Sequence, residues 1–239
     1  MYVTLPMITK SRSLIFLAVT VSAYFLYSKY SSFELPILDK KDFDLSLVDS
    51  ETQNSNKEHK IPDFEFLNQE GRVFTNENLD GKIYIADFFF TSCAGICPIM
   101  TKNMFKIQQE FINDSLVKIV SHTVHPEKDS VAVLNEYAKL NNINSKKWHL
   151  LTGDKKALYD IARKGYFAVS KVDDNIENAF IHTENFILVD NFQRIRGVYN
   201  GTLPYEITRL IEDIYFLKKS LQTKKGSLKK TLLTKKKYR

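Results

Sequence analysis

One short stretch limits what this chain can fold into. An apolar run over residues 83–90 ends just before Cys93 and Cys97, the only two cysteines in the sequence. A run of this length and composition predicts a strand that is covered on both faces, at the centre of a sheet. Pro98 suits the first turn of a helix, where a missing N–H group costs little. The sequence therefore predicts a buried strand that delivers two thiols to the start of a helix.

The position of the two cysteines at a helix start predicts reactive thiols. Unpaired N–H groups and the positive end of the helix dipole favour thiolate, so we expect lowered pKa values for Cys93 and Cys97. Redox motifs of the thioredoxin type have two residues between their cysteines, whereas three occur here, including Gly95. The wider loop leaves room for an ion between the sulfurs. A structural disulfide or a pair of inert buried thiols is the alternative.

The N-terminal segment predicts export. Lys10 and Arg12 precede the uncharged segment 13–28, which we interpret as a transmembrane anchor that follows a cytoplasmic segment, 1–12. A cleaved signal peptide is the alternative. Since positive flanking residues stay in the cytoplasm, everything after residue 29 is expected to be exported. The expected location is a bacterial inner membrane, crossed once, with the soluble domain in an oxidising periplasm.

Two further segments are expected to lie outside the folded domain, which we place at residues 58–217. Residues 29–57 are polar without a sustained period and indicate a linker. Residues 218–239 carry ten Lys or Arg and no acid, enough to explain the formal net charge of +6, and are expected to form a solvated, disordered tail. Contact with anionic lipid or an acidic partner is the alternative. A nucleic-acid partner is not expected, because the tail would be exported and lacks a supporting motif.

Between these segments, predicted strands and helices alternate. The expected strands are residues 62–67, 72–75, 83–90, 116–122, 148–151, 184–190 and 194–199. The expected helices are residues 98–111, 129–140, 154–162 and 203–217. We expect Asp129 to cap the second of these helices. This alternation predicts an α/β fold with a central mixed sheet flanked by helices, in the element order of a thioredoxin-like fold.

One of the five histidines, His182, lies just before the expected strand 184–190. In a thioredoxin-like sheet this loop lies beside the cysteine turn. Redox members of that fold place a cis-proline in the loop, yet no proline occurs between Pro126 and Pro204. A histidine there completes a set of two thiolates and one imidazole, which suits Cu(I) and, with added oxygen or water, Cu(II).

Several short motifs occur together within residues 60–216. They are Phe90-Thr-Ser-Cys-Ala-Gly-Ile-Cys-Pro98, Gly153-Asp154, Gly165-Tyr-Phe167, and Ile181-His182-Thr183 ahead of Leu188-Val-Asp190. In these motifs the chain resembles the Sco (SenC-type) family of copper-binding assembly proteins for cytochrome c oxidase. The resemblance implies that Cys93, Cys97 and His182 bind copper. It also implies that the ion, or reducing equivalents from the cysteines, passes to the binuclear copper centre of the oxidase's copper-bearing subunit. Another copper donor is left open as a second partner.

Other residues near the motifs compete as ligands. His125 replaces the acid of the family's usual Asp-Pro segment, and it could add a ligand, change partner docking or have no effect. His122 and His149 are expected to be packed or hydrogen-bonded. Met100 and Met104 are expected to fill the core rather than to bind copper as thioethers. Zinc is the competing metal, but a structural zinc site normally has four protein ligands.

Three functions compete with a membrane-anchored copper chaperone. An exported thiol-disulfide reductase would use Cys93 and Cys97 to keep the oxidase subunit's cysteines reduced, with His182 as a pKa modifier. A peroxide-reducing enzyme would need a nearby Arg, and none occurs between Arg72 and Arg163. A copper-sensing or copper-storing module remains open.

Overall fold

The computed structural model describes residues 15–24, 34–44, 46–48, 50–55, 57–168 and 183–237. The chain divides into two units, Met1–Glu34 and Leu35–Arg239. In the first unit, residues 15–24 are helical. No helix within the described ranges is long and apolar enough to cross a membrane. The remainder of the expected anchor, 13–28, lies outside the described residues.

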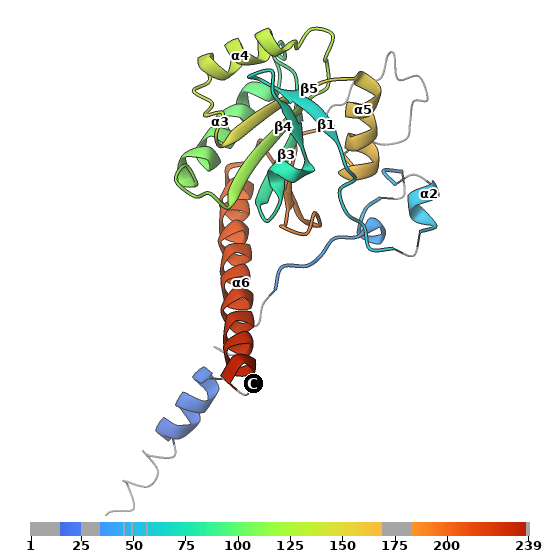
Figure 1. Cartoon of the computed structure of the whole chain (residues 1–239). Helices are drawn as coiled ribbons and strands as arrows, with labels where there is room; N and C mark the ends of the chain where they lie inside the picture. The colour runs from blue at the N-terminus through green and yellow to red at the C-terminus, as the bar shows by residue number, and fades with distance from the viewer. Residues whose placement is uncertain are drawn as a thin grey trace, which may run out of the picture. The chain divides into compact units, whose positions relative to one another are not determined.

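A mixed sheet forms the centre of the second unit, and its described part has seven strands in the order β2-β1-β5-β4-β3-β6-β7 (Figure 1). The strands are β1 (Glu65–Asn68), β2 (Val73–Thr75), β3 (Ile83–Phe89), β4 (Val117–Thr123), β5 (Trp148–Thr152), β6 (Asn185–Val189) and β7 (Ile195–Asn200). Strand β3 pairs in parallel with β4 and antiparallel with β6. The prediction of a central mixed sheet is confirmed.

Helices lie against both faces of this sheet (Figure 1). The α-helices of the second unit are α2 (Ser50–Gln53), α3 (Cys97–Glu110), α4 (Val131–Leu140), α5 (Lys155–Asp160) and α6 (Pro204–Lys237). The short helical turns are η1 (Lys40–Asp42), η2 (Asn76–Leu79) and η3 (Ile161–Gly165). Residues of α3, α4 and α6 share one buried cluster, whereas α5 and η3 contribute to the cluster on the other face.

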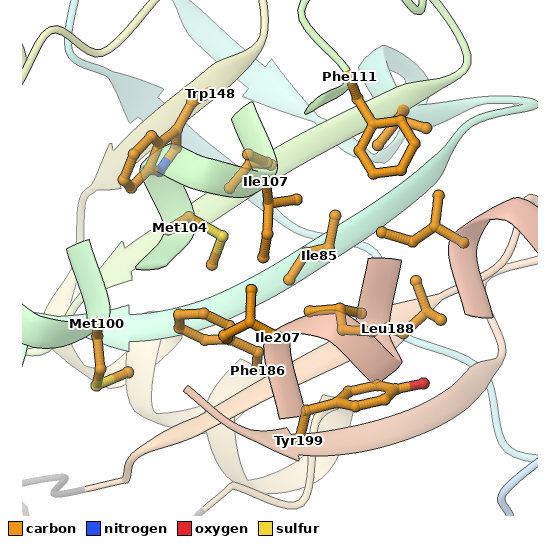
Figure 2. Packing of buried hydrophobic residues seen from close by; sticks show 14 of the residues in the cluster. Ile85, Met100, Met104, Ile107, Phe111, Trp148, Phe186, Leu188, Tyr199 and Ile207 are labelled. Carbon is orange, nitrogen blue, oxygen red and sulfur yellow. The ribbon is translucent and has the colours of Figure 1, made fainter. Parts of the chain in front are cut away.

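The apolar stripe of α3 explains why this helix packs on the sheet. Met100, Met104, Ile107 and Phe111 recur at helical spacing, and all four are buried. Figure 2 shows them in one buried cluster with Leu188 and other apolar residues of the strands and α6. The prediction that both methionines belong to the core is confirmed. Because α3 is held along its length, its first residues are held at the end of β3.

The segment before β1 packs on the domain, contrary to the predicted linker over 29–57. Leu38 forms a β-bridge with Ile195, and its N–H group donates to the Ile195 carbonyl at 2.9 Å. The guanidinium of Arg196 donates to the carbonyls of Leu35 and Pro36. A boundary at residue 58 is therefore too late, because backbone pairing and one arginine fix the chain from Leu35 onward.

The C-terminal helix is also longer than expected. Residues 218–237, predicted to be disordered, continue α6 up to Lys237. Ile207, Leu210 and Ile214 bury the first turns of α6 against the sheet, which supplies the nucleus that a helix otherwise forms at a cost. Lys and Leu have good helix propensity, so the helix extends once it is nucleated.

Candidate metal centre

The two cysteines flank a tight turn between β3 and α3. The Cys93 N–H group donates to the Phe90 carbonyl at 3.3 Å, and the N–H groups of Ile99 and Met100 donate to the Ile96 carbonyl at 3.0 Å. Cys97 is the first residue of α3 and is 5% exposed, whereas Cys93 is partly exposed. Both cysteines are free thiols. The turn therefore presents one accessible and one buried sulfur.

The two thiols influence each other and have different acidities. Burial raises the pKa of Cys93, but hydrogen bonds from the backbone and thiol of Cys97 and from the backbone of Gly95 and Ile96 outweigh it, so the net pKa is lowered. Burial raises the pKa of Cys97 to about 12, and the bond to Cys93 adds to the increase. The expectation of two lowered pKa values is thus wrong for Cys97, because the core covers its sulfur.

A buried acid lies on β3 near Cys97. Asp87 lies on the same face of β3 as Ile85 and Phe89, which pack on the α3 side. Its carboxylate accepts a hydrogen bond from the Ser121 hydroxyl. Burial raises the pKa of Asp87 to about 7. Its charge contributes to the raised pKa of Cys97. Sequence reasoning missed this residue because it treated 83–90 as a uniformly apolar run, although a single acid in such a run was the available signal.

A second buried carboxylate, Asp129, joins the turn to the end of β4. It accepts the Thr91 N–H at 3.2 Å, the Thr91 hydroxyl at 2.5 Å and the Thr123 hydroxyl. The residue that caps α4 is Ser130, whose Oγ accepts the Val133 N–H at 3.4 Å. The prediction that Asp129 caps this helix is therefore wrong by one position.

His182 lies outside the described residues. The strand that follows it, β6, pairs with β3 so that Ile187 is opposite Ala86. Continuing this register brings Asn185, at the start of β6, to the end of β3 from which the cysteine turn leaves. Where side chains are described, no group of three His, Cys, Asp or Glu could hold a metal ion. The structure thus brings Cys93 and Cys97 together, and the role of His182 stays a prediction.

The prediction that His122 and His149 are packed is confirmed. His122 is 0% exposed and lies among aromatic rings that include Phe88 and Tyr166. Burial lowers its pKa to about 3. The ring of His149 lies 4.4 Å from that of Phe74, and burial lowers its pKa to about 4.

His125 lies on the segment between β4 and α4, close to the turn. Its N–H group donates to Thr123 Oγ1 at 3.0 Å, and its ring centroid lies 6.4 Å from that of Phe90. The residue is partly exposed. It is therefore near the cysteine turn, but these contacts do not assign it as a ligand.

An apolar surface adjoins the cysteine turn. A groove of about 410 Å³ is lined by Thr91, Ala132, Val133, Glu136, Tyr137 and Leu140. Leu140 is 81% exposed, and Ile99 near the start of α3 is also exposed. A partner that reaches Cys93 therefore meets a mostly apolar rim.

The chain matches the family model described as SCO1/SenC over residues 52–216. Among curated relatives, the SCO1 protein homolog of Bacillus subtilis (strain 168) is 31% identical over 158 residues, which cover 65% of this chain and 81% of the relative. A SCO1/SenC family lipoprotein from Bacillus anthracis str. Ames has a solved structure that is 31% identical. The match covers 66% of this chain and 95% of that one, with a TM-score of 0.58.

Two further solved structures share the fold. BsSco, described as a member of the Sco family of cytochrome c oxidase assembly proteins with a disulfide switch, is 30% identical. Its match covers 66% of this chain and 92% of that one, with a TM-score of 0.57. ScoI of Bradyrhizobium japonicum, solved with copper bound, is 21% identical over 63% of this chain and 96% of that one, with a TM-score of 0.51. At that identity the second likeness supports the thioredoxin-like fold of the Sco proteins and no more.

Proposed function

This chain belongs to the SCO1/SenC family, and from that premise we propose that it is a copper chaperone for the assembly of cytochrome c oxidase. The observation that carries the proposal is the pair of free thiols, one accessible and one buried, that flank the turn between β3 and α3. Copper is the cargo, and the binuclear copper centre of the oxidase's copper-bearing subunit is the proposed acceptor. Cys93 and Cys97 supply the two thiolates.

The chemistry of these donors fits a copper ion. Soft thiolates select Cu(I), and one added imidazole makes a three-coordinate set that also admits Cu(II) with oxygen or water. We assign the imidazole to His182. The pairing of Ile187 with Ala86 supports this assignment, because it starts β6 at the end of the sheet that holds the cysteine turn.

The difference between the thiols suits loading and release. Cys93 is accessible and its pKa is lowered, so it is the sulfur that incoming copper or a partner's ligand meets first. Cys97 must lose its proton to become a ligand, and its pKa of about 12 opposes that loss. Copper therefore competes with a proton at Cys97, and its affinity should rise with pH. Oxidation of the pair to a disulfide would prevent binding.

We further propose that the domain works outside the cytoplasm, on a bacterial inner membrane. Support comes from the uncharged segment 13–28 after Lys10 and Arg12. The Bacillus anthracis relative is described as a lipoprotein. Expressing the chain and separating membranes from supernatant, with 13–28 either intact or deleted, tests this part of the proposal.

Copper titration of the reduced chain tests the metal site. We expect one copper per chain and, in the Cu(II) form, a sulfur-to-copper charge-transfer band. The band should be lost in Cys93→Ser and Cys97→Ser and lost or shifted in His182→Ala. Leu140→Ser, on the exposed surface, is a control that should keep the stoichiometry. A reduced chain that retains no copper, or retains it without either cysteine, contradicts the proposal.

A second function, thiol-disulfide reduction of the oxidase subunit, is favoured by one observation. An accessible thiol of lowered pKa beside a buried thiol of raised pKa is the arrangement of an attacking and a resolving cysteine. His182→Ala separates the two functions. If oxidase assembly survives this change but not the loss of Cys93 or Cys97, reduction rather than copper delivery is the function.

A further inference from the structure

The carboxylate of Asp129 is the meeting point of two segments that border the metal centre. Its side chain is 0% exposed. On one side it accepts the N–H group and the hydroxyl of Thr91, two residues before Cys93. On the other side it accepts the hydroxyl of Thr123, the last residue of β4. One buried group therefore holds the start of the cysteine turn against the neighbouring strand.

The same contacts extend to the segment that carries His125. Thr123 Oγ1 donates to Asp129 and accepts the His125 N–H at 3.0 Å. The backbone N–H of Asp129 donates a hydrogen bond to the His125 carbonyl at 2.9 Å. The loop of residues 125–129 is thus closed on itself and joined through one carboxylate to Thr91. A displacement of this loop would be transmitted to the turn that holds Cys93.

The strength of these contacts follows from the charge and burial of the acceptor. Hydrogen bonds to an ionised carboxylate are about twice as strong as neutral ones, and a buried carboxylate that loses its donors is costly. None of the ion pairs in the described part of the chain includes Asp129. Its partners are the donors of the two threonines, so its contacts serve to hold these segments together.

We propose that Asp129 is a positioning residue of the metal centre, which sets the location of the Cys93 sulfur by holding Thr91 against the end of β4. This inference rests on the proposed function, because the sulfur it positions is assigned there as a copper ligand. Asp129 itself does not touch the metal in this proposal. Residues that orient a ligand in this way typically change metal affinity 10- to 100-fold when they are replaced.

The test compares Asp129→Asn and Asp129→Ala with two variants of Thr91. Asn retains the size of the side chain but offers an NH₂ group to donors, so copper affinity should fall about tenfold and the Cu(II) charge-transfer band should shift. Thr91→Val removes only the hydroxyl bond and should show the same shift with a smaller loss of affinity. Thr91→Ser keeps the hydroxyl and should restore native behaviour.

Asp190→Asn is the matched control for general loss of stability. Asp190 is also a buried carboxylate, and it accepts hydrogen bonds from Arg194 and Arg196. The pairing of Tyr84 with Val189 places it near the start of β3, at the opposite end from the cysteine turn. This variant should unfold more easily than the native chain yet keep the native charge-transfer band.

A readout without copper separates failure of this inference from failure of the proposed function. If the native chain retains no copper, the proposed function fails, but the equilibrium of the Cys93–Cys97 dithiol with glutathione still reports the positions of the sulfurs. In that reaction one oxidised glutathione becomes two reduced molecules as the disulfide forms. We expect Asp129→Asn to change this equilibrium constant at least threefold.

The inference is overturned if folded Asp129 variants keep the native affinity, band and dithiol equilibrium within twofold. It is also overturned if Asp190→Asn shifts the band as much as they do. Should both Asp129 variants fail to fold by circular dichroism, Thr91→Val decides, since a native band in that variant contradicts positioning through Thr91.

Discussion

The hydroxyl of Ser121 donates a hydrogen bond to the carboxylate of Asp87, and Ser121 Oγ accepts the Trp148 Nε1–H at 2.7 Å. This pair places an ionisable acid inside the core between β3 and β4, on the side covered by α3. The acid is near enough to influence Cys97. Its ionisation therefore links the stability of the domain to the state of the metal centre.

Asp87→Asn should stabilise the protein above pH 7. Burial raises the pKa of Asp87 from 3.8 to about 7, so the folded protein holds its proton while the unfolded chain loses it between pH 4 and 7. Stability linked to this group is present below pH 4 and is lost as pH rises through 7. The free energy of unfolding of the variant, relative to that of the native chain, should be about 2–4 kcal/mol higher at pH 8 than at pH 4. Urea unfolding of both proteins at the two pH values measures the gain. Asp63→Asn, at an exposed position, should show no such gain. An equal response in both variants would contradict the raised pKa of Asp87.

Cys93 should react with iodoacetamide before Cys97. The lowered pKa and partial exposure of Cys93 favour its thiolate, whereas Cys97 is buried and its pKa is raised to about 12. At pH 7.5 the difference in rate should be at least about tenfold. Mass spectrometry of digested samples over time, with denatured chain as the control, measures both rates. Similar rates in the folded chain would contradict the described asymmetry.

His122 should destabilise the protein in acid. Its pKa is about 3 in the folded chain because burial disfavours the charged ring, against an ordinary value of 6.5. The unfolded chain therefore binds the proton first, and stability falls as pH drops from 6.5 towards 3. His122→Leu should reduce this loss by about 3–4 kcal/mol. The check is the free energy of unfolding at pH 7.5 and pH 4, and an undiminished acid loss would exclude His122 as its source.

Arg196→Ala should release the segment that packs before β1. The guanidinium binds the carbonyls of Leu35 and Pro36 and forms an ion pair with Asp190 at 2.9 Å. Its removal leaves a buried carboxylate with fewer partners, which should cost about 3 kcal/mol. Limited proteolysis should then cleave within residues 35–57 much faster than in the native chain. Arg72→Ala removes an exposed arginine and should not speed this cleavage. If Arg196→Ala is cleaved no faster than the native chain, backbone pairing alone holds the segment.

Local patterns were sufficient to predict the strand-turn-helix unit that carries the cysteines. The apolar run before Cys93 and the spacing of Met100 and Met104 encode burial directly, because side-chain direction follows the period of each element. The order of strands and helices then limits the topology to a few arrangements. For this reason the mixed sheet and the placement of both methionines agree with the prediction.

Three errors have a common physical origin in contacts between distant segments. The segment from Leu35 is held by Arg196, which lies 161 positions further along the chain. The helix beyond residue 217 continues because its earlier turns pack on the sheet. Aspartate is a common helix-capping residue, but the Asp129 carboxylate accepts hydrogen bonds from the hydroxyls of Thr91 and Thr123 instead. None of these partners can be identified from the sequence on either side of the residue concerned.

The identity and spacing of Cys93, Cys97 and His182, and the family to which their motifs point, are properties of the sequence alone. Tertiary structure decides how the two thiols differ. Both cysteines flank the same turn, yet core packing covers only the Cys97 sulfur and surrounds it with a buried acid and a second thiol. Since desolvation and charge depend on what the rest of the chain places around each sulfur, the acidity of the site belongs to the fold rather than to the motif.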